Sequence, residues 1–93
     1  MTEETMTRIV VVDDHPMYRK ALTALLRDQP GCEVVAEADN GVDAVAATGR
    51  TQPDVVLMDL AIPALNGIDA TRQIVASSPH IAVLVLTMYD DDE

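Results

Sequence analysis

The chain has 93 residues, a formal net charge of −10 and no Phe or Trp, so it is expected to form one small domain with an aliphatic core. This acidity disfavours direct nucleic acid binding, which needs a basic face, and no apolar run is long enough to span a membrane. The single cysteine, Cys32, cannot form an intramolecular disulfide and fits a reducing cytoplasm. Residues 1–7 are polar, lack a signal-peptide apolar region and are expected to form a disordered lead.

Four apolar runs predict β-strands, at residues 9–12, 33–37, 54–58 and 81–86. The first and third read as strands buried on both faces, which is typical of a parallel sheet. The second has charged ends and suggests a sheet edge. The fourth is the most apolar, and the sequence offers nothing after it to cover a strand that is apolar on both faces.

Helix signals separate these strands. Pro16 fits the first turn of a helix, Asn40 can cap a second with Asp43 at its third position, and Asn66-Gly67 precedes a third. The alternation predicts a parallel sheet with right-handed crossovers. Apolar spacing predicts the inner helix faces: Met17, Ala21, Leu22, Leu25 and Leu26; then Val42, Val45 and Ala46; then Ile68, Thr71, Ile74 and Val75.

Three carboxylates follow buried strands: Asp13 and Asp14 after the first, and Asp59 after the third. The carboxyl ends of parallel strands share one edge, where ligands bind in open sheets, so these side chains should meet. Close carboxylates repel one another, which raises a pKa or requires a cation. Oxygen ligands suit a hard ion, so the sequence predicts a Mg²⁺ site.

The spaced motifs resemble a known family. Residues 11–16 (VVDDHP) resemble its acidic-pair motif, residues 54–60 (DVVLMDL) with Pro63 and Gly67 resemble its phosphoacceptor segment, and residues 86–87 resemble its strand-four hydroxyl motif. The family is the receiver domain of bacterial two-component response regulators. The DDHP form and the ending MYDDDE are most similar to the NarL/FixJ subfamily, whose members usually carry a C-terminal helix-turn-helix.

The resemblance implies a flavodoxin-like (CheY-like) α/β/α fold with a parallel sheet of order 2-1-3-4. Residues 8–93 would form an incomplete receiver domain that lacks the usual last helix-strand-helix. The family's strand-five lysine would also be missing, since Lys20 is the only lysine in the sequence and lies mid-helix.

The resemblance also implies roles for individual residues. Asp59 would accept a phosphoryl group from a sensor histidine kinase. Asp14 and Asp59 would bind Mg²⁺ directly with the backbone carbonyl of Ala61, and Asp13 would act through water. The Thr87 hydroxyl would contact the phosphoryl group and register phosphorylation. Such a domain is a signalling module rather than an enzyme, and would regulate transcription through an output domain absent from this chain.

Three other functions are compared with this one. A haloacid-dehalogenase-like hydrolase is strongly disfavoured, because it needs a second acid two residues after its nucleophile, where this chain has Ala61. A flavodoxin-like nucleotide binder needs a glycine-rich loop after the first strand, where Asp13-Asp14 would repel phosphates. A non-phosphorylated fragment could instead self-associate as a homo-oligomer through residues 81–86. His15 is expected to be a solvent-facing loop residue.

Overall fold

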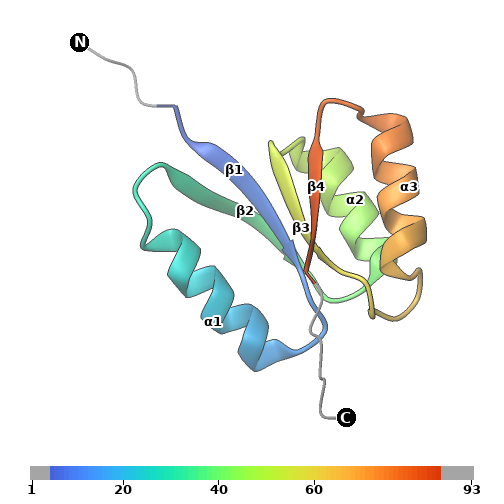
Figure 1. Cartoon of the computed structure of the whole chain (residues 1–93), viewed down its shortest axis with the longest axis horizontal. Coiled ribbons are helices and arrows are strands. Elements are labelled where there is room, and N and C mark those ends of the chain that lie inside the picture. Colours follow the sequence, from blue (N-terminus) through green and yellow to red (C-terminus); the bar gives the residue numbers. More distant parts are fainter. Residues whose placement is uncertain (1–4, 87–93) are drawn as a thin grey trace.

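The computed structural model describes residues 5–86, in which strands and helices alternate along the chain (Figure 1). The strands are β1 (Thr7–Val12), β2 (Cys32–Ala38), β3 (Val55–Asp59) and β4 (Ala82–Leu86). The helices are α1 (Pro16–Arg27), α2 (Gly41–Thr51) and α3 (Gly67–Ser77). β1 therefore includes Thr7, and α2 continues past Gly49 to Thr51.

The four strands form one parallel sheet of order β2-β1-β3-β4, which confirms the predicted order and the edge position of β2. Val12 of β1 lies opposite Met58 of β3, and Asp59 lies opposite Leu86 of β4. The loops that leave β1 and β3 consequently start side by side at the carboxyl edge of the sheet.

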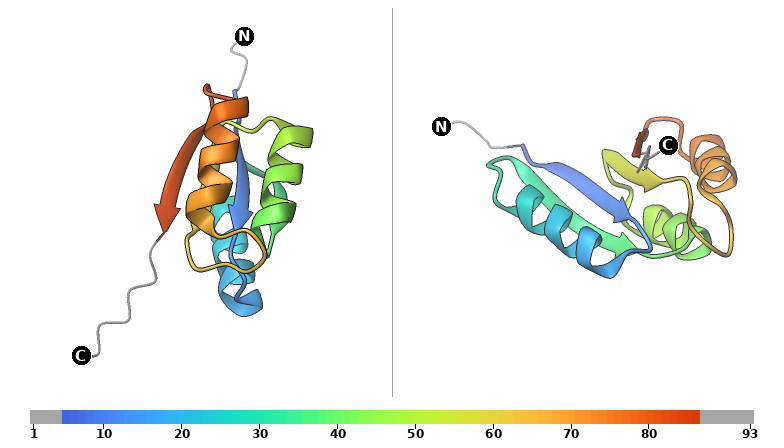
Figure 2. Two further views of the ribbon diagram at one scale, coloured as in Figure 1. Left: turned by 90° about the vertical axis from the view of Figure 1, so that its right-hand side faces the viewer. Right: turned by 60° about the horizontal axis from the view of Figure 1, so that its bottom comes forward.

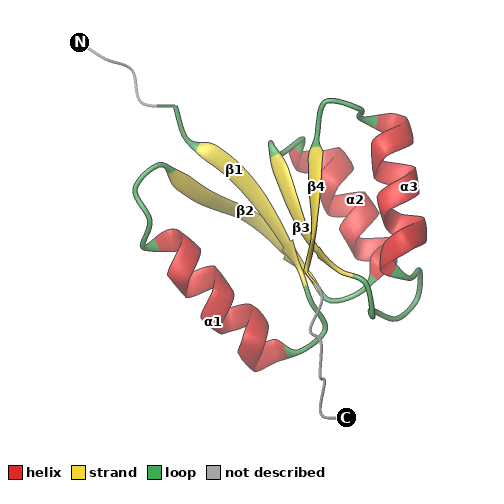
Figure 3. Ribbon diagram, in the orientation of Figure 1, coloured by secondary structure: helices red, strands yellow, loops and turns green. Residues whose placement is uncertain are grey.

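The helices cover the two faces of the sheet unequally (Figures 2 and 3). α2 and α3 lie side by side on one face, whereas α1 lies on the opposite face along β1 and β2. In the described part of the chain, no second helix joins α1 on that face. The arrangement is an α/β/α fold in which one outer layer holds a single helix.

The main core lies between the sheet and the α2–α3 layer. Buried Val10, Val12, Val56 and Met58 of the strands pack there against small helical residues. The predicted inner faces of these helices are partly wrong, because Val42, Ile68 and Val75 are 56%, 52% and 45% exposed. The buried helical residues are mostly small: Gly41, Ala44, Ala47 and Thr48 in α2, and Gly67, Ala70 and Ile74 in α3.

The inner face of α1 also differs from the prediction. Met17 and Leu25 are 84% and 62% exposed, so the predicted apolar stripe does not face the sheet as a whole. The residues of α1 that are buried or half-buried are Arg19, Leu22, Thr23 and Leu26. Their spacing is that of one helix face, but two of them are polar. Apolar periodicity alone therefore predicts a different face of α1 as the buried one.

β4 is an edge strand within residues 5–86, paired with β3. Leu84 and Val85 are 55% and 46% exposed. Because successive strand residues point to opposite faces, β4 presents apolar side chains on both faces of the sheet. No helix formed by residues 5–86 has both the length and the apolar character needed to cross a membrane.

Candidate functional site

The candidate site lies where the chain leaves β1 and β3. Asp13 follows β1 directly, and its backbone N–H donates to the carbonyl of Ala38, 3.0 Å away at the end of β2. Asp59 is the last residue of β3. Asp13 is fully buried and Asp59 is 3% exposed, whereas the side chain of Asp14 is 33% exposed. One end of this acidic site is thus buried in the fold and the other reaches solvent.

The structure brings together the three carboxylates that the sequence singled out and adds a fourth side chain. One potential ligand atom from each residue lies within 4.8 Å of the others, and the residues are Asp13, Asp14, His15 and Asp59. We call these four residues the acidic cluster. Three carboxylates so close repel one another strongly unless positive charge lies between them.

The hydrogen bonding of the acidic cluster fits a cation. Oδ2 of Asp13 and Oδ2 of Asp59 are buried and accept no hydrogen bond from any described residue, and the buried Oδ1 of Asp14 has the ring Nδ1 of His15 beside it at 3.1 Å. Buried polar atoms are normally hydrogen-bonded, so the unpartnered oxygens of Asp13 and Asp59 need an explanation. A hard divalent cation prefers oxygen ligands, and carboxylates gathered in this way are suited to hold Mg²⁺.

His15 is the member of the acidic cluster that can carry positive charge, which it does when protonated. Its Nδ1 lies 2.9 Å from Oδ1 of Asp13 and 3.1 Å from Oδ1 of Asp14, while its backbone N–H donates to Oδ1 of Asp13 at 2.8 Å. The hydrogen bond to Asp13, and then the charge of Asp14, raise the pKa of His15 above its ordinary value. The side chain is 60% exposed, as expected for a loop histidine, but its contacts with both aspartates were not predicted.

The loop between β3 and α3 is fixed by short-range bonds. Oδ1 of Asp59 accepts the backbone N–H of Ala61 at 3.1 Å. The N–H of Gly67 donates to the carbonyl of Leu60 at 3.1 Å, and Asn66 caps α3 through the N–H of Asp69. Ala61 therefore lies next to the Asp59 side chain. Its carbonyl as a metal ligand stays a prediction, and Thr87 lies outside the described residues.

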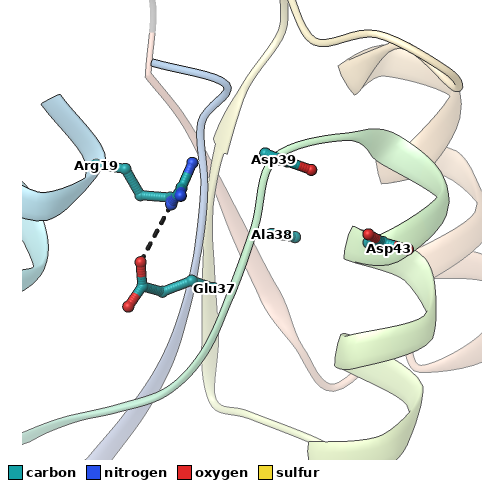
Figure 4. A pocket seen from close by; sticks show the side chains of 5 residues that line it. All are labelled: Arg19, Glu37, Ala38, Asp39 and Asp43. Carbon is teal, nitrogen blue, oxygen red and sulfur yellow. Dashed lines mark hydrogen bonds and ion pairs between the residues drawn. The ribbon is translucent and has the colours of Figure 1, made fainter. Parts of the chain in front are cut away.

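Arg19 also contacts the acidic cluster, although sequence reasoning did not select it. Its Nη1 donates to the backbone carbonyl of Asp13 at 2.8 Å, and its Nε donates to Oε1 of Glu37 at 3.1 Å (Figure 4). The signal in the sequence was its spacing from Leu22, Thr23 and Leu26 on one face of α1. A cavity of about 220 Å³ opens beside this ion pair, lined by Arg19, Glu37, Ala38, Asp39 and Asp43.

Comparison with known proteins identifies the class. The response regulator receiver domain family matches residues 9–93, nearly the whole chain. The chain therefore belongs to the response regulator receiver domain family.

Several transcriptional regulators are similar to this chain. It is 39% identical over 89 residues to the transcriptional regulatory protein DegU of Brevibacillus brevis, an alignment that covers 96% of this chain and 38% of DegU. It is 41% identical over 87 residues to the response regulator GacA of Pseudomonas aeruginosa, covering 94% of this chain and 41% of GacA. The chain thus spans about two fifths of the length of these curated relatives.

Solved receiver structures have the same fold. A LuxR-family two-component response regulator from an Aurantimonas species superposes with a TM-score of 0.86 at 40% identity, covering 92% of this chain and 61% of that one. The receiver domain of a response regulator described as NarL from Mycobacterium tuberculosis superposes with a TM-score of 0.87 at 30% identity, covering 95% and 71%. The predicted family and fold are confirmed.

Proposed function

We propose that this receiver domain accepts a phosphoryl group on Asp59 from a sensor histidine kinase, with Mg²⁺ held by the acidic cluster. The observation that carries the proposal is the buried oxygen Oδ2 of Asp59, which has no hydrogen-bond partner in the described chain and lies beside two other carboxylates. A carboxylate oxygen can act as the nucleophile in phosphoryl transfer.

The chain's own residues prepare Asp59 for this role. The N–H of Ala61 holds Oδ1, which leaves Oδ2 as the free oxygen. Asp14 and Asp59 are the proposed direct ligands of Mg²⁺ together with the Ala61 carbonyl, and Asp13 contributes through water. Bound Mg²⁺ supplies positive charge that offsets the charge on the transferring phosphoryl oxygens. The Thr87 hydroxyl is the proposed contact for the phosphoryl group.

The relatives support a regulatory context. DegU is described as a transcriptional regulatory protein and GacA as a response regulator. We place this chain in the cytoplasm as the signal-receiving part of such a regulator, with DNA contacts made by an output domain outside these 93 residues. The domain would act as a signalling module whose only catalysis is its own phosphorylation and dephosphorylation.

Labelling by a small-molecule phosphodonor such as acetyl phosphate tests the role of Asp59. The wild-type chain with Mg²⁺ should gain one phosphoryl group, measured by intact-protein mass spectrometry. Asp59→Asn should abolish the label, because the amide lacks the nucleophilic carboxylate oxygen.

Asp54→Asn is the matched control, because Asp54 directly precedes β3 at the end of the strand opposite Asp59. Asp54 accepts the backbone N–H of Arg8 through Oδ2 at 2.8 Å, and asparagine keeps a side-chain oxygen for such a bond. Labelling of this variant should equal that of the wild type. A label that survives Asp59→Asn would place the acceptor elsewhere.

A second candidate function rests on β4. Leu84 and Val85 are about half-exposed on an edge strand, which is a common arrangement for pairing with another chain. A protein-interaction module that self-associates through β4, without phosphorylation, would use this surface. The labelling experiment separates the two candidates, since this one predicts no Asp59 label.

A further inference from the structure

We propose that Arg19 is a positioning residue that orients the metal-binding loop, an inference that rests on the proposed function. Arg19 lies on the sheet-facing side of α1, and its side chain is 19% exposed. Its guanidinium makes two directed contacts, with the carbonyl of Asp13 at 2.8 Å and with Oε1 of Glu37 at 3.1 Å. Figure 4 shows the side chain reaching from α1 to Glu37 on β2.

The bond to Asp13 acts on a particular peptide unit. The Asp13 carbonyl belongs to the peptide that joins Asp13 to Asp14, so Arg19 fixes the link between two residues of the acidic cluster. On the other side of Asp13, its N–H is held by the Ala38 carbonyl at 3.0 Å. The backbone of Asp13 is therefore held on both sides, by α1 and by β2, and its carboxylate direction follows from that backbone.

Glu37 holds the guanidinium in place. The planar guanidinium can serve two acceptors in a fixed geometry, which the flexible, compact ammonium of lysine does not reproduce. The pair also balances charge: an unpaired arginine this close to the cluster would repel a divalent cation, whereas Glu37 offsets that repulsion. Orientation, rather than charge, is thus the contribution of Arg19 to metal binding.

Titration of the full 93-residue chain with MgCl₂ by calorimetry tests this role. Arg19→Gln should weaken Mg²⁺ binding about tenfold, the usual cost of losing a residue that orients a metal ligand. Arg19→Lys should also weaken it, although it keeps the positive charge. The opposite result, tighter binding by Arg19→Gln, would mean that charge repulsion dominates, and wild-type affinity in either variant would equally overturn the proposal.

Arg27→Gln is the matched control. Arg27 lies further along the same helix, and its Nη2 is 4.0 Å from Oε2 of Glu37, so the substitution removes an arginine beside the same glutamate. Mg²⁺ affinity should stay within about twofold of the wild type, because exposed ion pairs contribute little. An equal loss in Arg27→Gln and Arg19→Gln would show that net charge, and not the bond to Asp13, sets the affinity.

Amide hydrogen exchange without metal gives an independent measurement. The His15 N–H donates to Oδ1 of Asp13 at 2.8 Å, so its exchange rate reports how firmly the Asp13 carboxylate is held. Arg19→Gln should speed this exchange about tenfold, and Arg27→Gln should leave it unchanged; unchanged exchange in Arg19→Gln would overturn the positioning role. If Arg19→Gln fails to fold, Arg19→Lys serves in both measurements.

The two measurements separate this inference from the proposed function. Absence of Mg²⁺ binding by the wild-type chain would overturn the proposed function. The exchange comparison would still decide whether Arg19 holds the loop, since it needs no metal.

Discussion

Asp13 and Asp59 are almost fully buried carboxylates that come from different strands and lie beside Asp14. Burial and mutual repulsion both disfavour three negative charges at one place. In the described structure, the His15 ring lies beside Asp13 and Asp14 and offsets their charge when it is protonated, and the Ala61 N–H donates to Asp59. One buried oxygen of Asp13 and one of Asp59 still accept no hydrogen bond from a described residue, and a divalent cation would neutralise the remaining negative charge.

Removing Asp14 should abolish the stabilisation of the fold by Mg²⁺. A ligand that binds only the folded state raises the free energy of unfolding by mass action, about 1.4 kcal/mol at a concentration ten times its Kd. Thermal melts of the wild-type chain should therefore shift upward with millimolar Mg²⁺, and melts of Asp14→Ala should not. Without metal, Asp14→Ala should be no less stable than the wild type, because it relieves repulsion.

The control for this experiment is Asp39→Ala. Asp39 is exposed and follows β2 at the same edge of the sheet, so its removal changes the net charge equally. Its Mg²⁺ response should match that of the wild type. An equal response in Asp14→Ala would contradict the assignment of Asp14 as a ligand.

At the scale of elements, the strands and caps were predictable and the helix faces were not. Apolar runs gave all four strands to within two residues at their ends, and Asn40 and Asn66 cap α2 and α3 through Asp43 and Asp69. Strand and cap signals depend on residues that are close together in the chain, so they can be recognised from the sequence alone. The convergence of the three aspartates was also predictable, because parallel strands place their carboxyl ends at the same edge of the sheet.

The inward face of a helix depends on tertiary partners. Arg19 turns toward the sheet in α1 because Asp13 and Glu37 accept hydrogen bonds from its guanidinium. Thr23 can be buried on the same face because its hydroxyl donates to the Arg19 carbonyl within the helix. In α2, Val45 packs against the core as predicted, but Ala44 and Ala47 are the buried residues, whereas the predicted Val42 and Ala46 are exposed. The contacts of His15 are local, with the two preceding aspartates, but they depend on the backbone conformation of the loop after β1, which has no periodic sequence signal.

The start of α2 should be intolerant of any side chain at Gly41. A Cβ added there would lie 1.6 Å from the carbonyl oxygen of Leu65 in the β3–α3 loop, and the Gly41 N–H also donates to the Pro63 carbonyl at 3.1 Å. Because the obstacle is backbone, Gly41→Ala should lower the free energy of unfolding by about 1–3 kcal/mol. Urea denaturation measures this change.

Gly49→Ala is the comparison within the same helix. Apart from the adjacent residues and the nearby backbone of α2 itself, no described atom lies within 4 Å of a Cβ added at Gly49, which is exposed. Alanine should therefore raise stability by about 0.5–1 kcal/mol through its higher helix propensity. If Gly41→Ala were also stabilising, the close approach of α2 to the β3–α3 loop would be refuted.

At the scale of the whole molecule, the two faces of the sheet are covered to different degrees. α2 and α3 bury one face, while α1 lies along β1 and β2 on the other. The apolar side chains of β4 and the outer residues Met17 and Leu25 of α1 remain exposed in the described chain. Each large aliphatic side chain stabilises a protein by roughly 1.5–3 kcal/mol when buried, so covering this surface would be favourable by several such contributions.

We therefore expect the 93-residue chain to self-associate through β4 at high concentration. Pairing of two β4 edges would satisfy backbone groups that face solvent and would bury Leu84 and Val85, which are 55% and 46% exposed. Size-exclusion chromatography with light scattering should show a species larger than the monomer. Val85→Lys should shift it toward the monomer, because a charge on an edge strand opposes pairing.

Val42→Lys makes the same substitution at a 56% exposed site on α2 and should leave the mass unchanged. A wild-type chain that stays monomeric at high concentration would contradict this expectation.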